Sequence, residues 1–204
     1  RAVGEDGLTD QDLKEIRLGR KINQSIVSQY YLFSGKHVND YLNGIVSKIR
    51  AHTDRPYLPY SMVILYDERI YATSAPGGFM YITTGMINYL ESEAELAAVV
   101  AHEIGRIQYS HPSLSDTKKF FDSLSQGGMM VGPLFGPYGA LAAVTLYIID
   151  QNMFNPKSDL KQMIMADTLA LEYLLAADYD PQGLIDVLLK MQYAKPEEKR
   201  TMSH

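Results

Sequence analysis

The stretch AELAAVVAHEIGRIQYSH, residues 94–111, contains side chains whose types and spacing suit metal chemistry. His102 and Glu103 stand side by side, and Arg106 follows one helical turn after His102. In the H-E-x-x-H motif of zinc hydrolases, two histidines four residues apart bind one zinc ion, and the glutamate takes a proton from the metal-bound water. Here arginine stands where the second histidine belongs. The stretch therefore matches the motif at His102 and Glu103 but lacks one metal ligand.

The remaining histidines offer few candidates for a replacement ligand. His111 lies nine residues after His102, so helical geometry places it away from the His102 face. We favour a role for His111 at the end of the helix, where a cation interacts with the helix dipole, over a metal-binding role. His37, His52 and His204 lie in other segments, and their spacing does not indicate a ligand. The absence of cysteine excludes disulfides and thiolate metal sites.

Composition limits the classes of function. The chain has 204 residues, enough for a full core, and we expect one domain over residues 1–204. A net charge of −5 without a basic run argues against nucleic acid as a partner. The sequence begins at Arg1 without Met or an apolar signal core, so we expect a processed or trimmed form of a longer protein.

Apolar spacing predicts the elements that position the motif. Residues 9–53 are expected to form two helices, the first of which begins with a capping box at Thr9 and Asp12. Three short apolar runs in residues 60–85 predict a small sheet, with the turn Pro76-Gly77-Gly78 before the last strand. Ser92 and Glu95 form a second capping box, which predicts a motif helix over residues 92–110.

The second half of the chain combines an unusual segment with two further helices. Residues 123–149 contain no charged side chain and are interrupted by several glycines and prolines, which argues against a membrane-spanning helix. We favour a Gly/Pro-rich loop followed by a buried helix, and the alternative is a lid or a membrane-surface contact through residues 127–149. Residues 157–193 are predicted to form C-terminal helices.

The chain resembles peptidase family M48, a family of zinc endopeptidases, over nearly its whole length. The resemblance includes an early E-x-x-L-G element at Glu15, Leu18 and Gly19. The motif region matches in order at Pro76, Gly77, Gly78, Thr84, Gly85, Glu95, Leu96, Ala97, His102, Glu103, Gly105 and His111, whereas Tyr71 and Thr73 depart from the pattern of the family. This resemblance implies an α+β, mainly helical, zincin-like fold with a small sheet next to the motif helix. It also implies zinc as cofactor and Glu103 as general base.

The family takes its third zinc ligand from the first glutamate of an E-x-E-A-D helix, whose aspartate orients a ligand histidine. The matching residues here are Met163 and Asp167, so the aspartate is kept and the ligand is replaced. Met163 is more suited to filling a core than to binding zinc. The resemblance therefore implies that His102 is the only retained ligand position, with Arg106 and Met163 at the other two. Asp167 and His111 are candidates for residues that support a ligand.

Two functions are consistent with this pattern. One is a catalytically impaired relative of the peptidases that binds a peptide or an unfolded protein segment, with zinc absent or weakly bound. The other is an active zinc endopeptidase whose ligands come from elsewhere or whose ligand positions were altered by engineering. The strand GGFMYITTG is either a hairpin arm or a peptide-binding edge, in which case Gly78, Phe79, Met80 and Tyr81 line the substrate. The resemblance suggests an exported bacterial protein.

Two structural expectations follow from these assignments. The motif helix should pack against the helix that carries Asp167, so that His102 and Asp167 approach each other. Arg106 should reach the position of the metal and lie within about 3.2 Å of a carboxylate oxygen of Glu103 or Asp167.

Overall fold

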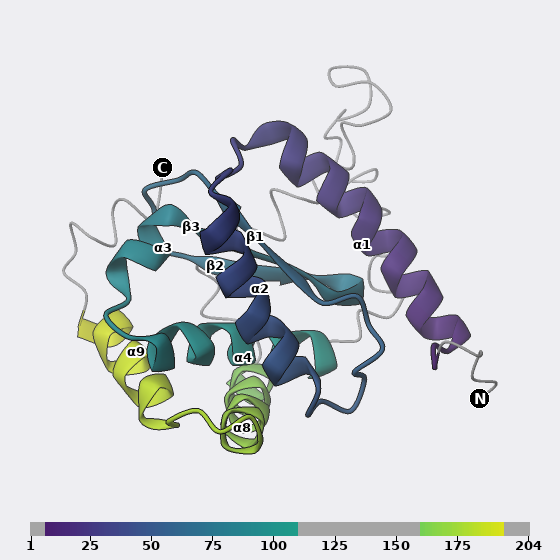
Figure 1. Ribbon diagram of the computed structural model, residues 1–204. Helices are drawn as coiled ribbons and strands as arrows, with labels where there is room; N and C mark the ends of the chain where they lie inside the picture. The colour runs from purple at the N-terminus through teal and green to yellow at the C-terminus, as the bar shows by residue number, and fades with distance from the viewer. Residues whose placement is uncertain (1–6, 110–159, 194–204) are drawn as a thin grey trace.

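The computed structural model describes residues 7–109 and 160–193 of the chain. The mainly helical α+β class predicted from the sequence is confirmed (Figure 1). In chain order the elements are α1 (Asp10–Gln29), α2 (Lys36–Arg50), β1 (Ser61–Leu65), β2 (Ala72–Ala75), the short 3-10 turn η1 (Pro76–Gly78), β3 (Phe79–Thr83), α3 (Thr84–Tyr89), α4 (Glu93–Tyr109), α8 (Leu160–Ala176) and α9 (Gln182–Tyr193).

Side-chain caps fix where two of the helices begin. The Thr9 hydroxyl accepts a hydrogen bond from the Asp12 amide at 3.2 Å, and the Asp12 carboxylate accepts one from the Thr9 amide at 2.7 Å. This reciprocal pair is the predicted capping box of α1. At α4 the Ser92 hydroxyl accepts from the Glu95 amide at 3.1 Å. The motif helix therefore begins where its sequence predicts, directly after Ser92.

The three strands form a mixed sheet in the order β1-β3-β2. β3 runs parallel to β1, with Ser61 opposite Phe79, and antiparallel to β2, with Ala72 opposite Ile82. β2 and β3 are thus the two arms of a hairpin, one of the two predicted roles of GGFMYITTG. β3 is the central strand, so the alternative role as an exposed edge is wrong.

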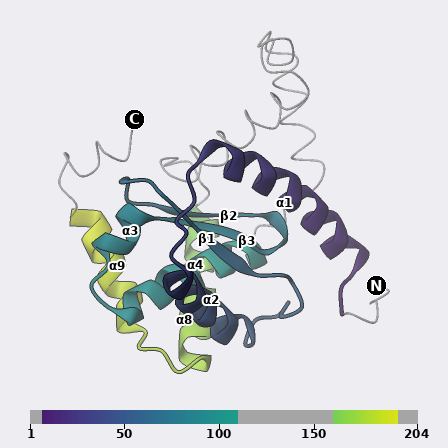
Figure 2. The same cartoon turned by 45° about the horizontal axis from the view of Figure 1, so that its top comes forward.

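The sheet lies between α1 on one face and α2 with α4 on the other, and α8 and α9 lie beyond α4 (Figures 1 and 2). Side chains alternate across β3 accordingly. Tyr81 joins Ile22 and Ile26 of α1 in one buried cluster, whereas Met80 and Ile82 belong to the other. Both faces of the sheet are therefore covered by helices.

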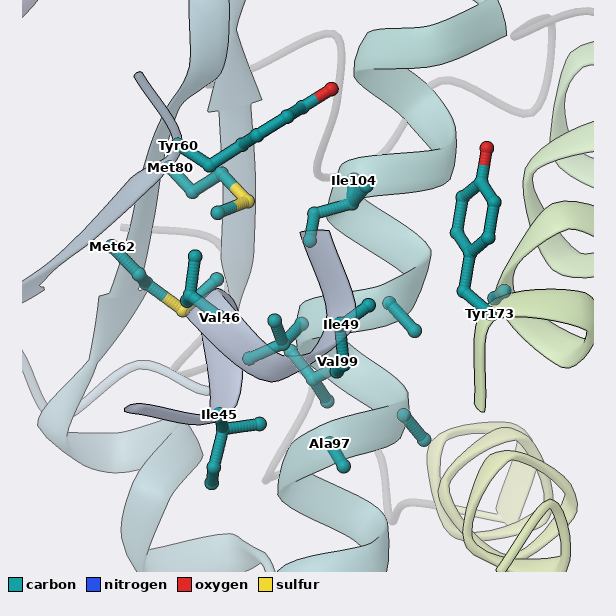
Figure 3. Close-up of a cluster of buried hydrophobic side chains, with 14 of the residues drawn as sticks. Ile45, Val46, Ile49, Tyr60, Met62, Met80, Ala97, Val99, Ile104 and Tyr173 are labelled. Atoms are coloured by element: carbon teal, nitrogen blue, oxygen red, sulfur yellow. The ribbon is translucent and has the colours of Figure 1, made fainter. Parts of the chain in front are cut away.

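The larger core surrounds α4 and fixes the position of the motif. Figure 3 shows Met62, Met80 and Val46 on one side of α4 and Tyr173 of α8 on the other. Within this core Val46, Met80 and Ile104 are fully buried. Each buried apolar side chain of this size contributes on the order of 2 kcal/mol. α4 is thereby held on several sides.

The E-x-x-L-G element in α1 has a packing explanation. A Cβ atom at Gly19 would lie 1.9 Å from the Pro76 carbonyl oxygen, so only glycine lets α1 approach η1 this closely. One turn earlier, Glu15 pairs with Arg55 at 2.7 Å, and Arg55 also pairs with Asp12. These contacts attach α1 to the turn before β3 and to the loop that precedes β1.

Three sequence predictions lie wholly outside the described residues: the Gly/Pro-rich segment 123–149, the membrane contact through residues 127–149, and His111. Within the described residues, no helix combines the length and apolar character that crossing a membrane requires.

Candidate functional site

The candidate site lies on α4 at the side facing α8. His102 and Arg106 are one helical turn apart, and their side chains are 25% and 23% exposed. Glu103 is buried, with a side chain only 4% exposed. The predicted motif residues therefore lie together, two at the surface of the helix and one in the protein interior.

His102 and Asp167 meet across the interface between α4 and α8, as predicted. The distance between His102 Nδ1 and Asp167 Oδ1 is 2.8 Å. An ionised carboxylate is only an acceptor, so Nδ1 donates the hydrogen, and in the neutral form of the ring Nε2 is left as the acceptor. This is the arrangement in which a protein presents a histidine to a metal ion or to a hydrogen-bond donor.

Gly105 is what lets the two helices come this close. A Cβ atom at Gly105 would lie 2.6 Å from the carbonyl oxygen of Ala166, the residue that precedes Asp167. Any larger side chain would push α8 away from α4. The glycine within the motif helix thus has a packing role that determines whether Asp167 reaches His102.

Arg106 pairs with Glu103, as expected, but at a longer distance. The Arg106 Nη1 atom lies 3.6 Å from Glu103 Oε1, which makes an ion pair without the geometry of a hydrogen bond. The second oxygen, Oε2, is buried and has no hydrogen-bond partner among the described residues. The predicted contact within about 3.2 Å is therefore wrong in distance, although the two partners are the expected ones.

Met163 lies on α8, one turn before Asp167, with 48% of its surface exposed. The interpretation of Met163 as a core residue is therefore wrong, because a core side chain would be buried. Residues four apart share a helix face, so Met163 and Asp167 lie on the same side of α8.

The donors at the three ligand positions do not match what a zinc ion requires. Zinc sites are built from imidazole, carboxylate and thiolate groups. Of these His102 supplies one, while Arg106 offers a cation and Met163 a thioether that suits softer metals. In residues 7–109 and 160–193 there is no group of three or more His, Cys, Asp or Glu side chains that could hold a metal ion. The Glu103 Oε2 atom is buried, and it accepts no hydrogen bond from the described residues.

The proposed substrate strand needs correction. Met80 and Tyr81 are fully buried, and the Tyr81 hydroxyl donates to Asn23 Oδ1 at 2.9 Å. Gly78 is also buried, and Phe79 pairs with strands on both sides. β3 therefore offers no free edge to an extended peptide, because its backbone pairs with β1 and β2 on its two sides.

The sheet element beside the motif helix is instead β2, which the sequence did not single out. β2 is an edge strand of the described sheet and contacts α4. Ser74 lies opposite Met80 in the register, so it is on the face of the sheet that α4 covers. The turn Pro76-Gly77-Gly78 joins β2 to β3 in a hairpin. Because β1 adds on the other side of β3, β2 is left as an edge strand of the described sheet.

Comparison with known proteins identifies the family of the chain. Residues 36–204 match the sequence profile of peptidase family M48. The chain is 22% identical over 184 residues to the beta-barrel assembly-enhancing protease of Escherichia coli (strain K12), a match that covers 87% of this chain and 37% of the relative. It is 23% identical over 165 residues to the protein of the same name in Yersinia pestis, covering 76% of this chain and 32% of the relative.

A eukaryotic relative matches over a shorter stretch. The mitochondrial metalloendopeptidase OMA1 of Arabidopsis thaliana is 24% identical over 136 residues, which is 65% of this chain and 26% of the relative. The chain thus spans about a third of the length of the bacterial relatives it matches. Because the family profile covers most of the sequence, from α2 onward, this chain belongs to peptidase family M48.

Proposed function

We propose that this chain is a metallopeptidase-family domain that has lost two of three zinc ligands and binds a peptide or an unfolded protein segment without hydrolysing it. The observation that carries the proposal is the ion pair between Arg106 and Glu103, since it puts a cation of the protein at a ligand position. The thioether of Met163 at the third position supports the same conclusion.

Without a zinc ion, the site would lack the group that activates water for hydrolysis. Zinc polarises the peptide carbonyl and lowers the pKa of bound water, and Glu103 would act only on water activated in this way. A glutamate alone contributes general base catalysis, which is a small part of what peptide hydrolysis needs. With Arg106 beside it, Glu103 is placed to form an ion pair rather than to accept a proton from a metal-bound water.

The proposed location for the peptide is the outer edge of β2, which is an edge strand of the described sheet. β2 contacts α4, and Ser74 lies on the face directed at that helix. An extended segment lying there would add a strand along the edge of the sheet. Two relatives are bacterial proteins named for enhancing beta-barrel assembly, which supports an unfolded protein segment as ligand and an exported bacterial location.

The second candidate is an active zinc endopeptidase. The hydrogen bond between Asp167 and His102 favours it, because this bond holds His102 in the orientation that a metal ligand needs. The missing ligands would then come from outside the described residues, for instance from His111, or the ligand positions would have been altered by engineering.

An experiment with an unfolded protein separates the two functions. Purified chain is mixed with fluorescently labelled reduced casein, with added zinc or with EDTA, and anisotropy and gel electrophoresis report binding and cleavage. We expect binding of equal strength in both conditions and no cleavage. Cleavage that depends on zinc would favour the second candidate.

A pair of matched variants tests the location. Ser74→Arg places a large cation on β2 and should weaken casein binding by about tenfold, as for a contact at the centre of an interface. Ser47→Arg makes the same change at an exposed position of α2 and should leave binding unchanged. Equal effects of both variants would contradict the placement of the peptide beside β2.

A further inference from the structure

Glu103 is an acidic side chain placed in the protein interior. Its side chain is 4% exposed, and α4 holds it next to Ile104, which belongs to the main core. Glu103 Oε2 has no hydrogen-bond partner within the described part of the chain. A carboxylate in such surroundings strongly destabilises the folded protein unless a positive charge lies nearby.

In a zinc peptidase the metal ion is the largest positive charge beside this glutamate. The donors at the ligand positions do not fit that ion, so the fold needs another source of positive charge. Arg106 supplies one at the second ligand position, with Nη1 3.6 Å from Glu103 Oε1. A guanidinium stays protonated at all physiological pH values, so this charge is permanent.

We infer that Arg106 is a built-in counter-charge that replaces the metal ion in stabilising the buried Glu103, so that the domain keeps its folded motif helix without metal. The inference rests on the proposed function, because it takes the site to be metal-free. It goes beyond that proposal by giving Arg106 a stabilising role that does not depend on any bound peptide.

The distance indicates which property of Arg106 matters. At 3.6 Å the pair lacks hydrogen-bond geometry, so the attraction is mainly between the two charges. The interaction is also weakly screened by salt, because Glu103 is buried. A lysine at this position should therefore retain much of the effect, whereas an uncharged side chain of similar size should lose it.

A double-mutant cycle measures the coupling between the two charges. The variants are Arg106→Gln, Glu103→Gln and the double change, each unfolded in urea in the presence of EDTA. Arg106→Gln should lower the folded-to-unfolded ratio both in the original chain and in the Glu103→Gln variant. We expect the decrease in the original chain to be about tenfold larger, as for residues in contact. Arg106→Lys should lose much less than Arg106→Gln.

A control on another helix accounts for general effects of removing arginine. Arg20 is exposed on α1, far from the motif in sequence, and Arg20→Gln should leave the ratio unchanged. If Arg106→Gln fails to fold while the double variant folds, the strong coupling supports the inference. Equal losses from Arg106→Gln with and without Glu103 would overturn it.

The metal state of the same samples keeps the two ideas apart. If the purified protein holds no zinc and the cycle shows no coupling, the inference fails while the proposed function stands. If the protein holds stoichiometric zinc, the proposed function fails, whatever the cycle gives. If the cycle shows coupling and neither zinc nor EDTA changes the melting temperature, the result supports both the inference and the proposed function.

Discussion

Asp167 Oδ1 lies 2.8 Å from His102 Nδ1, although the two residues are 65 positions apart in the chain. The contact depends on Gly105, since a Cβ atom there would lie 2.6 Å from the Ala166 carbonyl oxygen. Asp167 thus orients His102, the histidine at the one predicted ligand position that keeps a zinc-type donor, while the other two predicted positions carry arginine and methionine. This combination favours a site that keeps its framework without its usual metal chemistry.

Gly105→Ala should destabilise the protein by about 1–3 kcal/mol, because the added methyl group forces α8 away from α4. Urea unfolding of the variant measures the loss. Gly44→Ala is the matched control: among the described residues, no atom outside the neighbouring backbone of α2 lies within 4 Å of the place that its methyl group would take, so alanine should stabilise the helix by about 0.5–1 kcal/mol. Stabilisation by both substitutions would contradict the close approach at Gly105.

The sequence predicts most of the local structure because its signals are local. The caps at Thr9 and Ser92 and the turn at Pro76 depend on neighbours a few residues away, and each marks an element boundary in the structure. The helix α3 was not predicted, although Thr83 caps it by accepting a hydrogen bond from the Met86 amide. Its six residues are too short for a clear helical period.

Features that depend on distant parts of the chain could not be predicted in this way. The central position of β3 requires β1 to add on the far side of the hairpin, and no local pattern specifies that order. The contact of Arg55 with Asp12 and Glu15 joins segments about 40 residues apart. At the site, the partners His102 and Asp167 were predicted from the family resemblance, whereas the exposure of Met163 required the structure.

Arg55→Met should destabilise the protein by about 3 kcal/mol. The substitution removes the guanidinium that contacts both Asp12 and Glu15, so two largely buried carboxylates lose their counter-charge. Thermal unfolding measures the loss. Adding Glu15→Gln to Arg55→Met should recover part of it, since one of the two charges is then removed. A further loss in the double variant would argue against this electrostatic account.

Acid should weaken the attachment of α1. Burial acts to raise the pKa of Asp12, but hydrogen bonds from Thr9 and pairing with Arg55 outweigh it, so the pKa lies below its usual value of 3.8. A lowered pKa in the folded state means that the carboxylate stabilises the protein above pH 3.8 and that this contribution is lost as the pH falls further. The stability difference between the original chain and Asp12→Asn should therefore be largest near neutral pH and shrink below pH 3.8. A difference that stays constant down to low pH would be inconsistent with the shifted pKa.

The combined change Arg106→His and Met163→Glu should create a zinc site. Histidine at residue 106 shares the helix face of His102, and glutamate at residue 163 shares the helix face of Asp167. We expect zinc at a hundred times its dissociation constant to stabilise the double variant by about 3 kcal/mol, which calorimetry with and without zinc measures. Each single change should give a much smaller response.

The control for this repaired site is His102→Ala in the double variant. Removing the one retained imidazole should abolish the zinc response, because two protein ligands hold zinc poorly. A zinc response that persists without His102 would show that the metal binds elsewhere, and the absence of any response in the double variant would contradict the placement of Met163.

The zinc content of the purified chain tests the central claim most directly. The protein is produced in zinc-supplemented medium, freed of loosely bound metal by gel filtration, and analysed by plasma mass spectrometry. The variant with Arg106→His and Met163→Glu is analysed in the same way as a positive control. Since His102 is the only zinc-type donor at the three ligand positions, we predict far less than one zinc per chain. Close to one zinc per chain, removable by EDTA with a fall in melting temperature, would contradict this account.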